Sequence, residues 1–260
     1  MSSTLQRRGR PRKVVFMLII LAIFVLPLGV AVTQHFADDQ RVTDWRSARH
    51  DSTGQAPDPA ATPEGVIQVY AARAFSWRGA FGVHTWIAAK AQHAPAYTRF
   101  EVVGWGVRRG GEAVRVGPGV PDGLWYGNRP TLIRELRGGA EVDALIARLH
   151  DAAQRYPHNH EYRLWPGPNS NTFIAYLGRA VPELSLDLPP TAIGKDYLPG
   201  GGVFAHAPSG GGVQVSFGGL LGLTLAAEEG VEINLLGLSA GVDFSPPALK
   251  LPGTGRLGAR

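Results

Sequence analysis

The chain of 260 residues contains no cysteine. This absence excludes disulfide bonds, thiolate metal ligands, cysteine nucleophiles and cysteine lipidation. Nucleophilic chemistry would have to use another side chain, and the folded state has no covalent cross-link.

Acidic residues are missing from the N-terminal part of the chain, where none precedes Asp38. Five of the 26 basic residues lie in the first thirteen positions, namely Arg7, Arg8, Arg10, Arg12 and Lys13. The rest of the chain carries 21 basic and 21 acidic residues and so has no net charge. Because binding to nucleic acid requires clustered basic side chains, the sequence predicts no nucleic-acid partner.

Residues 14–32 form a long apolar run without any charge. As a helix this run would be about 28 Å long, close to the hydrocarbon thickness of a bilayer. The basic tail, residues 1–13, should stay in the cytoplasm. We therefore expect a single-pass anchor in the inner (cytoplasmic) membrane, with the C-terminal domain on the periplasmic or extracytoplasmic side. The alternative is a cleaved signal peptide, whose apolar core is usually shorter, about 7–15 residues.

The rest of the chain predicts an α+β protein. Residues 33–65 are polar and proline-containing and indicate a tether. In residues 66–200 the pattern predicts strands over 66–72, 80–90 and 97–105, and helices over 140–156 and from about 170 to before Pro182. The expected core is an antiparallel sheet packed on two helices. Residues 201–260 predict short, glycine-interrupted strands packed on that core.

The apolar residues of the C-terminal region allow two interpretations. Residues 213–244 alternate apolar and small side chains. This region is either a second wall of the core or a surface that lies on the bilayer next to the anchor.

Ser170 is the first candidate for catalysis. It lies between two asparagines at the expected first turn of a helix, where unpaired N–H groups and the helix dipole would stabilise an anion. The same position suits an ordinary helix cap. His84, in the middle of a predicted strand, is the candidate base, because a serine hydroxyl needs an imidazole to take its proton.

Glu101 is the candidate for orienting His84. If residues 80–90 and 97–105 form a hairpin centred between Gln92 and His93, residue 84 lies opposite residue 101. A slip of one residue would replace the carboxylate by an apolar side chain.

No metal or cofactor is expected. His158, His160 and Glu161 have ligand-type side chains, but they lie in a segment typical of a solvated loop. The glycine triplets at 200–202 and 210–212 lack the strand and helix context of a nucleotide site.

Two short motifs together resemble the circularly permuted papain-like fold of the NlpC-type, LRAT-like and PPPDE-type enzymes. These motifs are the strand Val83–Ile87 and the helix start Asn169–Phe173. The resemblance implies a peptidase or acyltransferase with Ser170 in place of the usual cysteine, His84 as the histidine, and Glu101 or another polar group in the third role. Serine cannot form the thiolate–imidazolium pair, so the resemblance also allows an inactive enzyme whose groove only binds.

More closely, the chain resembles a bacterial membrane-anchored family known as a domain of unknown function (number 3750). The segments that carry this resemblance are 69–73, 82–86, 102–106, 165–173, 188–194 and 248–253. The family resemblance implies no established activity.

Three hypotheses follow. The first is an envelope hydrolase or acyltransferase acting on an ester or amide through Ser170, His84 and Glu101. The second is a non-catalytic envelope module that binds glycan, peptide or lipid in a groove lined by tryptophans, namely Trp86, Trp105, Trp125 and Trp165. The third is a structural protein of the membrane surface built around the C-terminal region.

Overall fold

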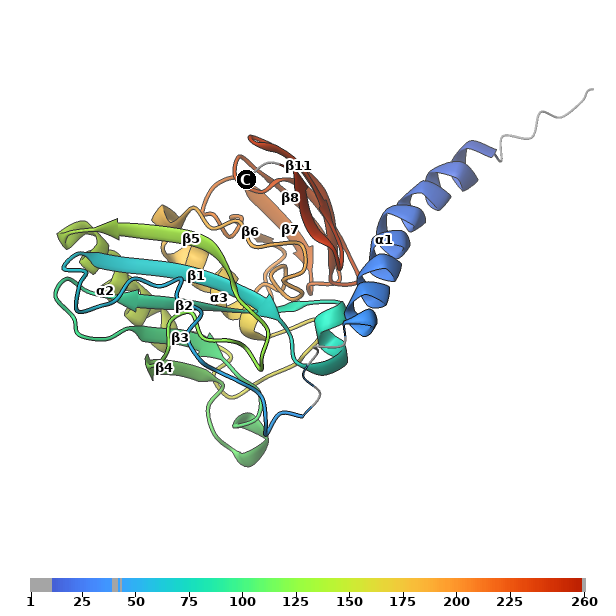
Figure 1. The fold of residues 1–260 in the computed structure, drawn as a ribbon. Coiled ribbons are helices and arrows are strands. Elements are labelled where there is room, and N and C mark those ends of the chain that lie inside the picture. Colours follow the sequence, from blue (N-terminus) through green and yellow to red (C-terminus); the bar gives the residue numbers. More distant parts are fainter. Residues whose placement is uncertain (1–10, 39–41, 43, 259–260) are drawn as a thin grey trace, which may run out of the picture.

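The computed structural model describes residues 11–38, 42 and 44–258. Arg7, Arg8 and Arg10 of the expected basic tail lie outside the described residues. The α+β class is confirmed: an N-terminal helix is followed by a five-stranded antiparallel sheet with two helices and by a C-terminal sheet (Figure 1).

The N-terminal helix α1 (Pro11–Ala37) continues five residues beyond the end of the expected anchor. Its segment Arg12–Ala37 has a mean hydropathy of 3.0, and it is long and apolar enough to cross a bilayer, a test that a signal sequence also passes. Figure 1 shows α1 projecting away from the folded domain.

The core sheet has the strand order β4-β3-β2-β1-β5. Its strands are β1 (Gly65–Arg73), β2 (Val83–Lys90), β3 (Thr98–Val102), β4 (Val114–Pro118) and β5 (Thr131–Gly138). The short 3-10 helices η1 (Ser76–Ala80) and η2 (Val107–Arg109) lie in the connections between strands. Every neighbouring pair is antiparallel.

Two helices are part of the main hydrophobic core on one face of this sheet. They are α2 (Ala140–Gln154) and α3 (Ser170–Ala180), and η3 (Pro182–Leu184) follows α3. Apolar residues at three- and four-residue steps give α2 one buried stripe, Val142, Ile146, Leu149 and Ala153. Because side chains alternate along a strand, Ile87 of β2 joins this core while Trp86 joins a smaller cluster on the opposite face.

Part of the expected tether packs on the core. The buried carboxylate of Asp122 accepts hydrogen bonds from the hydroxyl groups of Ser52 and Thr53 and from the backbone N–H groups of Thr53, Gln55 and Ala56. This carboxylate therefore fastens residues 52–56 to the loop between β4 and β5.

The C-terminal sheet has seven antiparallel strands in the order β12-β11-β10-β9-β8-β7-β6. They are β6 (Phe204–Ala205), β7 (Val213–Phe217), β8 (Leu221–Ala226), β9 (Gly230–Leu235), β10 (Leu238–Phe244), β11 (Pro247–Leu251) and β12 (Gly255–Gly258). Its buried side chains are mainly polar: Gln214, Ser216, Thr224, Glu232, Asn234, Ser239, Asp243 and Lys250. Hydrogen bonds and ion pairs therefore join this sheet to the preceding segment, as between Glu232 and Lys195.

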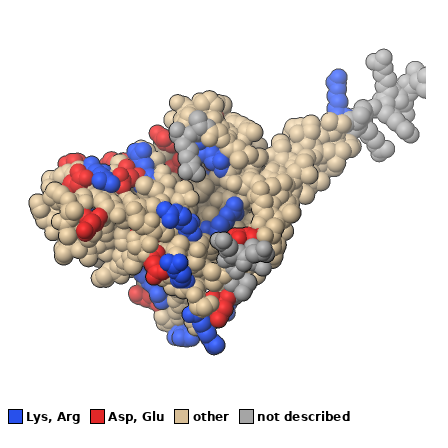
Figure 2. Space-filling model, viewed as in Figure 1, with Lys and Arg blue, Asp and Glu red and all other residues tan. Residues whose placement is uncertain are grey.

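Charged side chains are unevenly distributed over the molecule. In the view of Figure 2 they gather over the core, whereas α1 carries them only at its outer end.

Candidate functional site

His84 and Glu101 are brought together by the core sheet. Nε2 of His84 lies 3.3 Å from Oε2 of Glu101, and both side chains are largely buried. The expected hairpin register is wrong by two residues, because Ile87 pairs with Phe100 and Glu101 lies opposite Arg115 of β4. A shift of two residues leaves every side chain on its predicted face, so the contact between His84 and Glu101 survives the error.

An aromatic ring covers the imidazole of His84. The ring of Trp125 stacks on it, with centroids 3.6 Å apart and an interplanar angle of 7°. Trp125 also contacts two other aromatic rings. The ring of Trp105 lies nearly parallel to it, with centroids 6.2 Å apart and an interplanar angle of 18°, and the ring of Tyr126 lies edge to face, with centroids 5.1 Å apart. The three aromatic residues come from loops, and β2 supplies the histidine.

Arg99 completes the charged part of this cluster. Its guanidinium donates a hydrogen bond to Glu101 Oε2 at 2.9 Å and another to the carbonyl of Val120 at 3.0 Å. The guanidinium carbon also lies 4.6 Å from the ring centre of Trp86, a cation–π contact. Arg99 therefore holds Glu101 toward the aromatic loop that follows β4.

The protonation states follow from these contacts. Burial raises the pKa of Glu101, but the hydrogen bond from His84 and the charge of Arg99 outweigh burial and lower the pKa to about 2. Burial lowers the pKa of the His84 imidazole, and the hydrogen bond to Glu101 offsets this only in part. At neutral pH Glu101 is therefore ionised and His84 neutral. Because a carboxylate only accepts, the imidazole carries its proton on Nε2 and Nδ1 is the free base.

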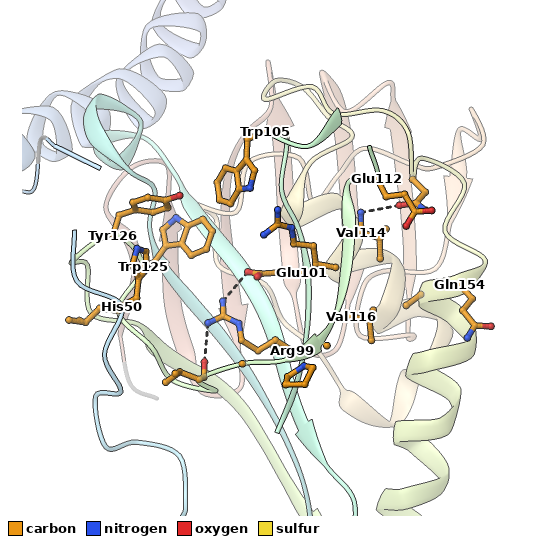
Figure 3. Close-up of a pocket in the computed structure, with 18 residues that line it drawn as sticks. His50, Arg99, Glu101, Trp105, Glu112, Val114, Val116, Trp125, Tyr126 and Gln154 are labelled. Atoms are coloured by element: carbon orange, nitrogen blue, oxygen red, sulfur yellow. Dashed lines mark hydrogen bonds and ion pairs between the residues drawn. The ribbon is translucent and has the colours of Figure 1, made fainter. Parts of the chain in front are cut away.

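Glu101, which holds His84, lines a pocket of about 860 Å³ together with Arg99 and the aromatic residues of the loops. Figure 3 shows Trp105, Trp125 and Tyr126 gathered at one end, next to Arg99 and Glu101. At the other end the pocket follows β4 toward the end of α2, past Glu112, Val114, Val116 and Gln154. Arg115 lines the pocket too, with its guanidinium carbon 5.4 Å from the ring centre of Trp105.

Ser170 lies in different surroundings from His84. It is the first residue of α3 and is buried. Two residues of β2 meet the start of α3: the hydroxyl of Thr85 donates to Asn171 Oδ1 at 2.9 Å, and the carbonyl of Val83 accepts from Asn171 Nδ2 at 3.0 Å. Thr85 and His84 point to opposite faces of the sheet. No hydrogen bond joins Ser170 to His84 among the described residues, so the structure brings two of the three candidate catalytic residues together and not the third.

The cap of α3 is Asn169 and not Ser170. Asn169 Oδ1 accepts the backbone N–H groups of Asn171 and Thr172, and the Thr172 hydroxyl accepts from the backbone N–H of Asn169. This reciprocal arrangement is a capping box. The polar residues around Ser170 thus serve to start the helix, while the catalytic role of Ser170 itself stays a prediction.

The remaining candidates are placed elsewhere. His158 Nδ1 lies 3.1 Å from Glu161 Oε2. Over the part of the chain that the structure describes, no three histidine or carboxylate side chains are grouped as a metal site would need. Of the four tryptophans expected in a groove, Trp105 and Trp125 line the pocket, and Trp86 lies beneath Arg99. Trp165 donates to the carbonyl of Leu236 in the turn between β9 and β10.

Sequence reasoning missed Arg99, Arg115 and Tyr126 as pocket residues. For Arg99 a signal was present, because it alternates with the apolar residues of β3 and so shares the face of Glu101. The position of Arg115 depends on the pairing of β4 with β3, for which the sequence has no local signal.

The fold and the site together define an α+β domain that follows an apolar N-terminal helix and carries a partly aromatic pocket along the β4 edge of its first sheet. Comparison with known families places the chain more closely. Residues 64–197 match the family described as Protein of unknown function (DUF3750), and the chain belongs to this family. No curated protein and no solved structure matches the chain.

Proposed function

We propose that the chain is a membrane-anchored binding module on the outer side of the cytoplasmic membrane, and that its pocket binds a carbohydrate of the cell envelope. The observation that carries this proposal is the nearly parallel pair Trp105 and Trp125 beside the Arg99–Glu101 ion pair, at one end of a pocket of about 860 Å³.

A sugar suits this combination of groups. The apolar C–H face of a pyranose ring packs on indole rings, and Trp105 has 47% of its surface exposed. Guanidinium and carboxylate groups meanwhile donate to and accept from the hydroxyls at the ring edge. Arg99 and Arg115 are balanced by Glu101 and Glu112 in the pocket lining, so the lining has no charge surplus to attract phosphate-rich ligands.

The anchor is the second part of the proposal. Residues 14–32 lie within α1, whose length and hydropathy suit a membrane span. The basic residues that precede this run favour a cytoplasmic N-terminus. The pocket would then face the envelope.

The serine hydrolase hypothesis receives less support from the geometry. A nucleophile should lie within hydrogen-bond reach of its base, and among the described residues the imidazole of His84 has Glu101 as its only hydrogen-bond partner. Trp125 stacks over the imidazole, and Asn169 accounts for the helix start.

The test is a binding titration of the full chain in lipid nanodiscs, with a tetramer of β-1,4-linked N-acetylglucosamine and with soluble peptidoglycan fragments as probes. Binding is followed by calorimetry and by tryptophan fluorescence. We expect Trp105→Ala to weaken binding about tenfold or more, because an aromatic side chain that becomes buried against its ligand is worth about 1–2 kcal/mol or more. The control is Trp45→Ala, since Trp45 is also an exposed tryptophan but does not line the pocket.

Two results would contradict the proposal. One is that neither probe binds, or that Trp105→Ala and Trp45→Ala weaken binding equally. The other is cleavage of the peptidoglycan fragments that disappears in Ser170→Ala, which would establish the hydrolase hypothesis instead.

A further inference from the structure

In the C-terminal sheet the buried face is polar and the exposed face is apolar, the reverse of an ordinary sheet in a soluble protein. Along β9 the burial alternates, with Glu232 and Asn234 buried and Ile233 and Leu235 exposed. The same alternation runs through the neighbouring strands. The exposed large apolar side chains of this sheet are Phe204, Val213, Phe217, Leu221, Leu223, Leu225, Ile233, Leu235, Val242, Phe244, Leu249 and Leu257.

Strand register joins these side chains into one surface. Phe204 pairs with Val215, Val215 with Leu223, and Leu223 with Ile233, so one row crosses four strands. Paired residues of neighbouring strands share a face. We call this surface the outer face of the C-terminal sheet.

The outer face carries no charged residue in the described strands. The four charged residues of β7 to β12 are Glu232, Asp243, Lys250 and Arg256, which pair among themselves at the opposite face. Seven strands at ~4.8 Å spacing and ~17–20 Å length give a sheet face of about 600 Å². The largest apolar patch on a typical soluble monomer is about 300–600 Å² and is often functional.

The outer face adjoins α1, on the side of the molecule from which this helix projects (Figure 1). The turn between β11 and β12 lies against the helix: a Cβ built on Gly253 would be 2.8 Å from the Cβ of Ala31 and 3.2 Å from Leu28. Further along α1, His35 Nε2 lies 3.0 Å from the carbonyl of Ser76 in η1. The helix therefore meets the C-terminal sheet within its apolar run, and beyond that run His35 meets the core domain.

We propose that the outer face of the C-terminal sheet docks onto the lipid bilayer that α1 crosses; this step rests on the proposed membrane anchor. The bilayer is the occupant that the structure favours, because the turn between β11 and β12 contacts the helix at Leu28 and Ala31, close to the outer end of the proposed membrane span. Edge strands carry unpaired backbone groups that hydrocarbon does not tolerate. The sheet thus lies flat, with its face toward the acyl chains and its edges at the level of the headgroups, and the pocket domain is held at a fixed orientation above the surface.

The chain has no cysteine, so single cysteines can be spin-labelled without background. The full chain is reconstituted in vesicles of phosphatidylcholine and phosphatidylglycerol with a nitroxide at Leu223→Cys or Ile233→Cys. Collision with oxygen, which concentrates in lipid, is compared with collision with a nickel chelate, which stays in water. Arg109→Cys, on an exposed residue of η2, is the matched control for water, and Leu18→Cys reports on α1.

We expect labels at 223 and 233 to collide with oxygen and to be shielded from nickel as strongly as the label at 18, with the reverse at 109. Nickel access at 223 and 233 equal to that at 109 would overturn the docking. So would shielding from both reagents with dipolar broadening that disappears on dilution with unlabelled chain, which indicates a second copy. The label at 18 decides the anchor separately, so lipid exposure at 18 with water exposure at 223 and 233 rejects only the docking.

Discussion

Glu101 is the residue on which the cluster in the pocket depends. It accepts from both His84 and Arg99 and lies opposite Arg115 in the sheet. The carboxylate stays charged when buried because a guanidinium compensates it, whereas the imidazole loses its charge because burial outweighs its single partner. In the His84–Glu101 pair the neutral imidazole donates and the anionic carboxylate accepts. This hydrogen bond fixes the tautomer of His84 and the orientation of the ring on which Trp125 stacks.

This assignment predicts how stability depends on pH. The pKa of folded His84 is lowered below its usual value of 6.5, so its contribution to folding is complete above pH 6.5 and is lost as the pH falls. In His84→Gln that contribution is absent. We therefore expect the difference in free energy of unfolding between wild type and His84→Gln to shrink between pH 7 and pH 5, measured by urea unfolding of the full chain in detergent micelles. A difference that grows on acidification would mean a charged imidazole paired with Glu101.

At the scale of elements, most of the core could be predicted from periodicity. The strand expected over 66–72 is β1, and the helix expected over 140–156 is α2, which ends at Gln154. The turn between β2 and β3 was harder to predict. The first strand ends at Lys90 and the second begins only at Thr98, and within the turn His93 adopts a positive φ of 56°. The face of β2 that α3 covers has no local signal. Thr85 rather than His84 meets the helix, and this choice depends on the packing of the whole sheet.

The start of α3 gives a prediction at the same scale. Asn169→Ala removes the acceptor of two backbone N–H groups and two donated bonds, to the carbonyls of Leu164 and Ile193. We expect it to lower the free energy of unfolding by about 2 kcal/mol or more, since a cap alone is worth about 1 kcal/mol. Ser170→Ala should cost about 1 kcal/mol or less, because it removes one buried oxygen atom but no helix cap. Urea unfolding compares the two, and a larger cost at Ser170 would refute this account.

At the scale of the whole molecule, the two sheets are joined by polar groups. Asp196 accepts from Gln214, Asn234 and Ser239 of the C-terminal sheet, while Lys195 pairs with Glu232. The alternation of apolar and small residues over 213–244 is visible in the sequence, but the sequence does not show whether the apolar side chains point into the molecule or outward. An apolar face is ordinarily turned inward, and here the buried polar partners turn it outward, which only the tertiary contacts reveal.

Lys250 tests whether these polar contacts hold the C-terminal sheet on the molecule. Its fully buried ammonium lies within 2.9 Å of carboxylate oxygens of Asp187, Glu232 and Asp243. Lys250→Met leaves buried carboxylates with less compensation, so we expect a loss of about 3–5 kcal/mol in the free energy of unfolding. The control is Arg148→Met, which breaks the exposed pair with Glu183 and should cost less than about 1 kcal/mol.

The loss in the free energy of unfolding caused by Lys250→Met should itself depend on pH. Burial raises the pKa of Asp187 to about 6 even with Lys250 present, and removing the lysine raises it further. In Lys250→Met the uncompensated negative charge of the buried carboxylates is therefore largest at alkaline pH, and it falls as Asp187 binds a proton. We expect the cost of Lys250→Met to fall as the pH is lowered from 8 to 5, measured by urea unfolding. A cost independent of pH would show that Lys250 acts through the packing of its alkyl chain, and the C-terminal sheet would then be held without the charge cluster.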